Sequence, residues 1–146
     1  EFRHIVRMAD TDLDGSQKVA YALTKIKGVG IRLAGAIVRA AGVNPEERLG
    51  NLTDEEIERL EDAIRNPLKY GIPPYLLNRQ RDPTTGKDLH LIGADLTLQV
   101  KADIDLMKKI KCWKGVRHSL GLKVRGQRTR TTGRKGATVG VRRKKK

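Results

Sequence analysis

Residues 17–41 read QKVAYALTKIKGVGIRLAGAIVRAA, and they hold two apolar helical repeats on either side of a pair of glycines. Apolar side chains recur at three- and four-residue spacing in both repeats, which predicts two amphipathic helices, Gln17–Ile26 and Ile31–Ala41. Ser16 is a candidate N-cap of the first helix, and Gly42 favours the end of the second. The side chains expected to face the core are Val19, Ala22, Leu23, Ile26, Ile31, Ala34, Ile37, Val38 and Ala41.

The Gly28-Val29-Gly30 turn between these helices allows two interpretations. Glycines let another backbone approach closely, and the free N–H groups at the start of the second helix can face a phosphate, with Lys25, Lys27 and Arg32 nearby. The turn is equally well explained as a tight helix–helix connection without a ligand. These residues alone do not decide between the two.

The N-terminal segment precedes the first helix. Residues 4–8, HIVRM, predict a strand or an extended arm. Residues 10–15, DTDLDG, match the first half of an EF-hand calcium loop. Position 12 of that loop is Tyr21 where a bidentate Glu is needed, so we interpret the segment as a polar turn.

Capping signals mark the middle of the chain. Asn44–Glu47 predicts a short helical turn, and Thr53 with Glu56 forms a capping box at the start of a helix that runs to about Arg65. Pairs at four-residue spacing, Glu55–Arg59 and Glu61–Arg65, are typical of a solvated helix face.

Two further elements follow Pro67. Residues 75–81 and 87–92 predict a β-hairpin around a turn at 82–86. The longest helix is expected from Leu96 to Cys112, with Asp95 as a candidate cap. Its expected inward residues are Leu96, Val100, Ile104, Met107 and Ile110.

Charge divides the chain at its final third. Residues 111–146 hold 14 Lys and Arg and no acidic residue, whereas residues 1–110 hold 17 of each sign, so the whole net charge of +14 lies in the tail. A concentrated positive charge implies a polyanionic partner, with nucleic acid as the first choice and an acidic membrane surface as the second. The tail has few apolar residues, and we expect it to be disordered in isolation.

Several classes of protein fit the composition poorly. One cysteine, Cys112, excludes an internal disulfide framework. No apolar run reaches the length of a transmembrane helix, and the N-terminus lacks a signal-peptide pattern. His4 and His90 have no partner at metal-ligand spacing. We expect no catalytic residues, metal or cofactor.

Within the tail, Val116–Leu120 predicts one short helix between Gly115 and Gly121. Arginines outnumber lysines until the last three residues, and arginine forms forked bonds with phosphate and stacks on bases. Such a segment with Gly, Thr and Gln spacers suits a specific fit along folded RNA. A nonspecific solubilising or nuclear-import tail is the alternative.

Three blocks in this sequence resemble the universal small-subunit ribosomal protein S-thirteen family, called S-eighteen in eukaryotes. They are Ile26–Gly30 (IKGVG), Arg117–Thr129 with its VRGQRT stretch, and Thr131–Gly136 (TTGRKG). The VRGQRT stretch is specific, whereas the turn alone is a weak signal. Residues 77–80 and the TVGV ending before the final basic run indicate an archaeal or eukaryotic type.

The resemblance implies a mainly α fold: a helix-two-turn-helix N-terminal domain with a small β-hairpin insertion, a long helix and an extended basic C-terminal tail. The expected domains are 1–110 (hairpin about 75–92) and 111–146. The resemblance implies a cytoplasmic, non-enzymatic protein in the head of the small ribosomal subunit. The implied partners are small-subunit rRNA, peptidyl-site tRNA, the neighbouring protein S-nineteen and large-subunit components at the intersubunit bridge, with no membrane.

The resemblance also suggests which residues bind RNA. The rRNA contacts expected from it are Lys27, Gly28, Val29, Gly30, Arg32, Lys114, Arg117, His118, Lys123, Arg125, Gln127, Arg128, Thr129, Arg130, Arg134 and Lys135. The expected tRNA contacts are Arg142, Arg143, Lys144, Lys145 and Lys146. The rival interpretation is a DNA-binding helix-two-turn-helix protein, either glycosylase-like or histone-like.

Overall fold

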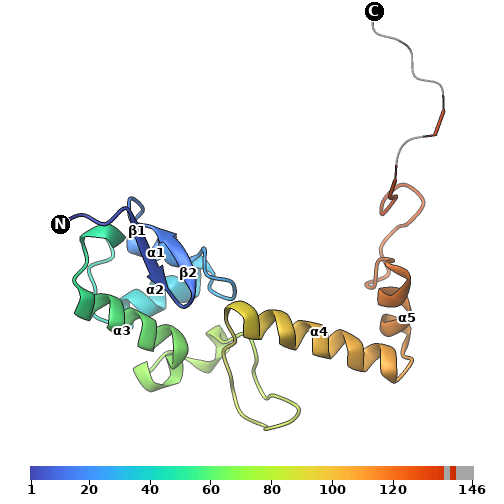
Figure 1. Cartoon of the computed structure of the whole chain (residues 1–146). Coiled ribbons are helices and arrows are strands. Elements are labelled where there is room, and N and C mark those ends of the chain that lie inside the picture. The colour runs from blue at the N-terminus through green and yellow to red at the C-terminus, as the bar shows by residue number, and fades with distance from the viewer. Residues whose placement is uncertain (137–138, 141–146) are drawn as a thin grey trace, which may run out of the picture. The chain divides into compact units, whose positions relative to one another are not determined.

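The chain begins with a two-stranded antiparallel hairpin, β1 (Ile5–Met8) and β2 (Thr11–Asp14), in a computed structural model that describes residues 1–136 and 139–140 (Figure 1). Val6, Met8 and Leu13 are buried on one face of the hairpin. The strand expected at residues 4–8 is therefore confirmed. The polar turn expected at 10–15 is smaller than predicted, because only Ala9 and Asp10 take positive φ and the next residues pair as β2.

The first predicted helix is shorter than expected. Helix α1 spans Val19–Leu23, and its N-cap is Lys18, not Ser16. The Ser16 backbone and hydroxyl instead donate to the Asp14 carboxylate, and Lys18 forms an antiparallel bridge with Arg48. Residues 24–26 continue as tighter turns, because their N–H groups bond three residues back rather than four.

Helix α2 (Ile31–Ala40) matches its prediction closely. Leu33, Ala34, Ile37 and Val38 are buried, and Gly42 follows the helix with φ +69°. The inward position expected for Ile31 is wrong, since its side chain is 49% exposed. Leu33 takes the core position in the first turn instead.

Helix α3 (Asp54–Arg65) has the predicted capping box, in which Thr53 and Glu56 each accept from the other's backbone N–H. Glu61 and Arg65 form the predicted ion pair at 3.0 Å. Arg59 instead donates to the Ala41 carbonyl at 3.2 Å, which ties α3 to the end of α2. These helices and the hairpin enclose an aliphatic core that runs from Val6 to Ile72.

The two strands of the β-hairpin predicted at residues 75–92 do not form. This segment is an irregular loop with a single antiparallel bridge, Arg79–Leu89. Its shape depends on Asp82, which is 7% exposed and accepts hydrogen bonds from Arg79 and Thr85. Pro83 and the positive φ of Arg81 interrupt a strand ladder here. The mainly α fold with one small antiparallel hairpin is confirmed, but the hairpin is β1–β2.

Two helices close the described chain, α4 (Gly93–Lys109) and α5 (Trp113–Leu120). The chain divides into two compact units, residues 1–98 and residues from Gln99 onward, so α4 belongs partly to each. Helix α4 ends before Cys112 because Lys111 has φ +56°. The expected inward face of α4 is wrong, since no residue of α4 is buried. Helix α5 extends the predicted 116–120 by three residues, with Gly115 inside it.

In residues 1–136 and 139–140, no helix has the length and apolarity to cross a membrane. In the same residues, no group of three or more His, Cys, Asp and Glu could hold a metal ion.

Candidate nucleic-acid interface

The Gly28-Val29-Gly30 turn is held by residues that follow it by about 65 positions. The Gly93 N–H donates to the Lys27 carbonyl at 2.8 Å, and Lys27 Nζ donates to Thr97 Oγ1 at 2.7 Å. Gly28 has φ +100°, and a Cβ added there would lie 2.5 Å from the Leu91 carbonyl oxygen. The close backbone approach at Gly28 is therefore made by the protein's own chain.

A clamp that the sequence did not predict holds the Leu91 backbone, which lies against Gly28. The Asn78 side chain donates to the Leu91 carbonyl at 2.7 Å and accepts from the Leu91 N–H at 2.9 Å. The Asn78 N–H donates to His90 Nδ1 at 3.2 Å. His90 Nε2 is buried beside the Gly28 backbone without a hydrogen bond of normal geometry, and burial lowers the pKa of His90. The clamp joins loop residues that are twelve or thirteen positions apart. A contact of this kind leaves no periodic pattern in the sequence.

Gly30 differs from Gly28 in a way that bears on ligand binding. It is the N-cap of α2 with an extended backbone, and a Cβ added there would meet nothing within 4 Å. No side chain caps α2 and no acidic residue lies in its first turn. The N–H groups of the first turn are thus open to an outside acceptor, next to the exposed Arg32. Val29 itself is 4% exposed and anchors the turn in the core.

The second cationic surface is built on α5. Gly115 lies where an added Cβ would be 2.2 Å from the Met107 carbonyl oxygen, so α5 packs directly on the end of α4. The Arg117 guanidinium lies over the Trp113 ring at 5.6 Å. Arg117 Nε donates to the Lys123 carbonyl at 2.8 Å, which turns the chain back after Gly121.

Residues 122–136 form an irregular segment with exposed cations. Thr132 donates to the Arg128 carbonyl, and Arg134 donates to the Arg130 carbonyl, so parts of this segment bond to themselves. A cavity of about 320 Å³ lies between the stretches 121–123 and 129–135. The expected contacts in this segment are all exposed: Lys123, Arg125, Gln127, Arg128, Thr129, Arg130, Arg134 and Lys135.

The remaining expected contacts fall into two groups. Lys114 is exposed on α5, whereas Arg117 and His118 are half-buried. The five expected tRNA contacts, Arg142 to Lys146, lie outside the residues that the structure describes. The structure thus places one group of expected contacts at the start of α2 and another from α5 onward.

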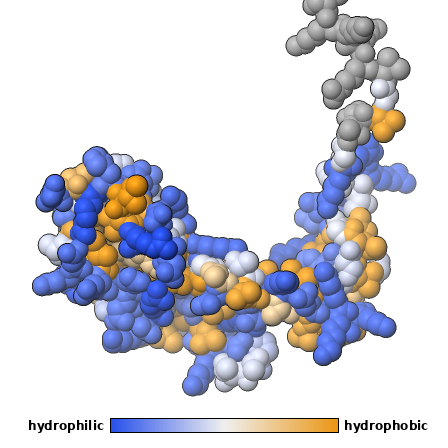
Figure 2. Space-filling model, in the orientation of Figure 1, coloured by the Kyte–Doolittle hydropathy of each residue, from blue (hydrophilic) through white to orange (hydrophobic). Residues whose placement is uncertain are grey.

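Apolar side chains also remain exposed near the cations. Trp113, Val116 and Leu120 follow helical spacing on α5, and Trp113 is 71% exposed. Helix α4 exposes Leu98, Val100, Leu106 and Ile110. Orange, apolar atoms are visible over both helices in Figure 2. Large exposed apolar side chains at helical spacing, as on α5, are typical of a surface that contacts another molecule.

Comparison with known proteins gives close relatives over nearly the whole chain. Three archaeal proteins, each named small ribosomal subunit protein uS13, illustrate the range of sequence identity. The Staphylothermus marinus protein is 61% identical over 99% of this chain and 96% of its own length. The Hyperthermus butylicus protein is 56% identical over 100% of this chain and 97% of its own. The Methanothermobacter thermautotrophicus protein is 54% identical over 100% and 98%, respectively.

The profile of one protein family, described as ribosomal protein S13/S18, matches residues 7–135. The match begins within β1 and covers β2, the Gly-Val-Gly turn, α4, α5 and the arginine-rich segment up to Lys135. The resemblance noted from the sequence is therefore confirmed, and this chain belongs to the ribosomal protein S13/S18 family.

Proposed function

We propose that this protein binds small-subunit rRNA through two surfaces, the start of α2 and the basic segment from Lys111 onward. As a family member, the chain is a non-enzymatic structural component of the small ribosomal subunit and acts in the cytoplasm, where ribosomes work. In this role the protein stabilises folded rRNA during assembly, because its Lys and Arg side chains neutralise phosphates.

The observation that carries the proposal is the exposed cation series after α5. Between Lys123 and Lys135 six Lys and Arg side chains are exposed, and no acidic residue follows Asp105. A single-sign surface without carboxylates to pair with is suited to a phosphate backbone. The uncapped start of α2 and the open space at Gly30 offer a second, smaller contact.

Removal of residues 111–146 tests the first surface. The truncated protein should lose most of its affinity for rRNA, and the log–log dependence of binding on salt should flatten by roughly 0.7–0.9 for each lost phosphate contact. Binding of rRNA with an unchanged salt slope would show that the basic segment is not the RNA-binding part.

A matched pair of variants separates charge from fit. Replacing Arg125, Arg128 and Arg130 with Gln should weaken binding and flatten the slope. Replacing the same three with Lys keeps the charge, so the slope should stay and only the affinity should fall, because lysine cannot form forked bonds. Equal affinity of the Lys variant and the wild type would show nonspecific attraction.

We further propose contacts with peptidyl-site tRNA through Arg142–Lys146, with the neighbouring protein S-nineteen, and with large-subunit components at the intersubunit bridge. The exposed apolar face of α5, including Trp113 and Leu120, supports a protein neighbour, because RNA phosphates alone leave such a face uncovered. Cross-linking in the assembled subunit should join α5 to a protein, and in the translating ribosome it should join Arg142–Lys146 to tRNA. Cross-links from α5 to rRNA alone would contradict the protein contact.

A further inference from the structure

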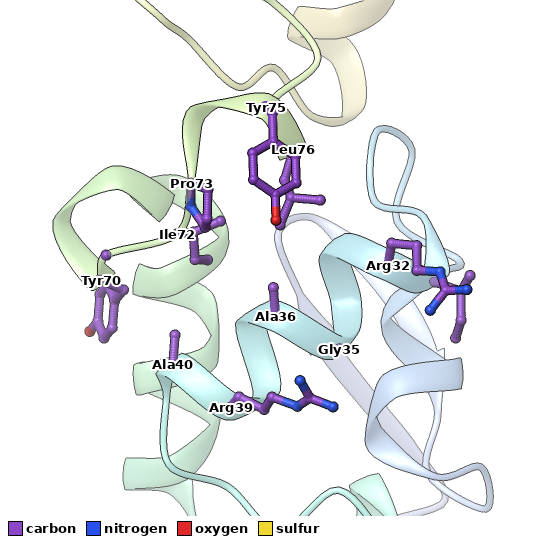
Figure 3. Close-up of a pocket in the computed structure, with 12 residues that line it drawn as sticks. Arg32, Gly35, Ala36, Arg39, Ala40, Tyr70, Ile72, Pro73, Tyr75 and Leu76 are labelled. Carbon is purple, nitrogen blue, oxygen red and sulfur yellow. The ribbon is translucent and has the colours of Figure 1, made fainter.

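A groove runs along α2 from the first turn of that helix. One wall is α2 itself, and the other is the chain from Tyr70 to Leu76, which passes over the helix (Figure 3). Its volume is about 970 Å³. All of its residues belong to the unit of residues 1–98.

The floor of the groove is made of small side chains. Gly35 and Ala36 lie at its centre, and a Cβ added at Gly35 would meet nothing within 4 Å. A mid-helix glycine weakens a helix by roughly 0.5–1 kcal/mol relative to alanine, and no internal contact of this structure requires glycine at this position. The absent side chain leaves room above the helix for an outside group.

Tyr75 stands over this floor from the opposite wall, with its hydroxyl directed toward α2 (Figure 3). Its side chain is 74% exposed, and its hydroxyl makes no hydrogen bond within residues 1–136 and 139–140. Tyr70 differs, because its hydroxyl donates to Asp62 Oδ2 at 2.8 Å. Tyr75 thus presents a free aromatic face and a free polar tip to the groove.

Arg32 and Arg39 supply the charge of the groove. They are seven positions apart on α2, about 10 Å along the helix axis, and in Figure 3 their guanidinium groups extend to the same side of α2. In the described part of the chain, neither forms an ion pair or a side-chain hydrogen bond, and no Asp or Glu lines the groove. Two uncompensated cations beside an apolar slot favour a ligand with a planar apolar part and negative charges around it.

We propose that this groove binds an unpaired nucleotide of RNA, with its base against Tyr75 and the small floor of α2 and its flanking phosphates on Arg32 and Arg39. Sequence-specific recognition of RNA uses such unstacked bases on aromatic and guanidinium planes. The proposal rests on the proposed rRNA binding and adds a specific subsite to it. Because the groove begins at Ile31 and Arg32, the RNA strand that meets the start of α2 can continue directly into it.

The charge pattern favours RNA over a polypeptide. An apolar peptide segment would gain from burial in the groove but would leave two arginines without partners, at a desolvation penalty. A nucleotide satisfies both parts, because each of its phosphates is a bidentate acceptor for guanidinium. An acidic peptide is the competing ligand, and the experiment below distinguishes it.

The test compares full-length variants in binding to a small-subunit rRNA fragment across a salt series. Tyr75→Ala should weaken binding roughly 5- to 100-fold with an unchanged salt slope, because base stacking carries no charge. Arg39→Gln should flatten the slope by about 0.7. Tyr21→Ala and Arg7→Gln are the matched controls, since both side chains are exposed away from the groove and should bind RNA as the wild type does.

The outcomes separate the groove from the general function. If the wild-type protein fails to bind rRNA, the proposed function and the groove both fall. If the wild type binds with its steep slope while the Tyr75 and Arg39 variants bind equally well, only the groove proposal is overturned. Ultraviolet cross-linking in the assembled subunit gives a direct readout: a Tyr75–base adduct supports the proposal, and a Tyr75–polypeptide adduct overturns it.

Discussion

Gly28 and Gly30 are two residues apart, yet they have opposite reasons to be glycine. Gly28→Ala combines a positive φ with a Cβ placed 2.5 Å from the Leu91 carbonyl oxygen, so we expect it to lower the free energy of unfolding by about 2 kcal/mol. Gly30→Ala has ordinary φ and open space, so its effect on stability should stay within about 1 kcal/mol.

In the folded protein, Gly30→Ala should weaken RNA binding more than Gly28→Ala does. Gly30→Ala places a methyl group in the open space before the first turn of α2, where a bound phosphate would lie, and we expect it to weaken rRNA binding by roughly 3- to 10-fold. Urea unfolding gives the stability difference, and titration of the RNA fragment gives the affinity. A Gly30→Ala protein with wild-type affinity would remove the start of α2 from the RNA surface.

Asp62 makes stability sensitive to acid. Its carboxylate accepts hydrogen bonds from Lys69, Tyr70 and Asn66, and these bonds, led by that from Lys69, lower the pKa of Asp62 to about 2. The native state therefore favours the ionised carboxylate. Its contribution is complete above the unfolded pKa of 3.8 and is lost as the pH falls through about 2.

The Asp62→Asn variant checks this directly. Relative to the wild type it should be less stable above pH 4, and the difference should shrink steadily between pH 4 and pH 2, as measured by urea unfolding at each pH. Asp10→Asn is the control, because Asp10 lies exposed in the β1–β2 turn without a side-chain hydrogen bond in the described structure. A pH-independent difference for Asp62→Asn would mean that the carboxylate acts only by shape.

At the scale of elements, Gly115 decides how α5 meets the end of α4. An alanine Cβ would lie 2.2 Å from the Met107 carbonyl oxygen and 2.7 Å from the Lys108 nitrogen, and neither backbone atom can move without unwinding α4. We expect Gly115→Ala to separate the two helices, to raise amide exchange in residues 113–120, and to weaken rRNA binding.

Ser119→Ala is the matched control for this joint. It removes one bond to the Gly115 carbonyl but adds no atom at the contact. Its amide exchange and affinity should stay close to those of the wild type. Equal exchange in the two variants would contradict the tight joint.

Elements with local signals could be predicted, and elements made by distant contacts could not. The α3 capping box and the extent of α2 depend on neighbouring residues, and both predictions agree closely with the structure. The predicted start of α1 was wrong because Lys18 pairs with Arg48, thirty residues away. The hairpin predicted at 75–92 was wrong because the buried Asp82 accepts hydrogen bonds from Arg79 and Thr85, and these replace a strand ladder.

The candidate site divides in the same way. The basic segment follows from composition alone, as does the pair of glycines at the turn. The clamp of Asn78 on Leu91 and the groove along α2 could not be predicted, because each joins segments far apart in sequence. The apolar periodicity of α4 predicted a buried face, whereas Leu96, Ile104 and Met107 are half-buried and no residue of the helix is fully buried. Periodicity indicates that a face needs a packing partner, but it does not identify that partner.

At the scale of the whole molecule, the buried core and the net positive charge are carried by different parts of the chain. Every buried apolar residue in the described structure lies between Val6 and Leu77, and the contacts that fix the turn end at Thr97. Since apolar burial is the main stabilising contribution, residues 1–98 should fold without the rest. The net charge, in contrast, lies entirely beyond residue 110.

A protein truncated after Leu98 should therefore melt cooperatively within a few degrees of the full chain, while its rRNA affinity should fall steeply together with the salt slope. Differential scanning calorimetry and RNA titration measure the two properties on the same sample. Truncation after Ala63 is the control for stability, because it removes Ile64 and Ile72 from the core and should abolish the cooperative transition. If the 1–98 protein is unfolded, the segment from Gln99 onward supplies stability as well as charge; if it binds rRNA with the full slope, the basic segment is not the main RNA contact.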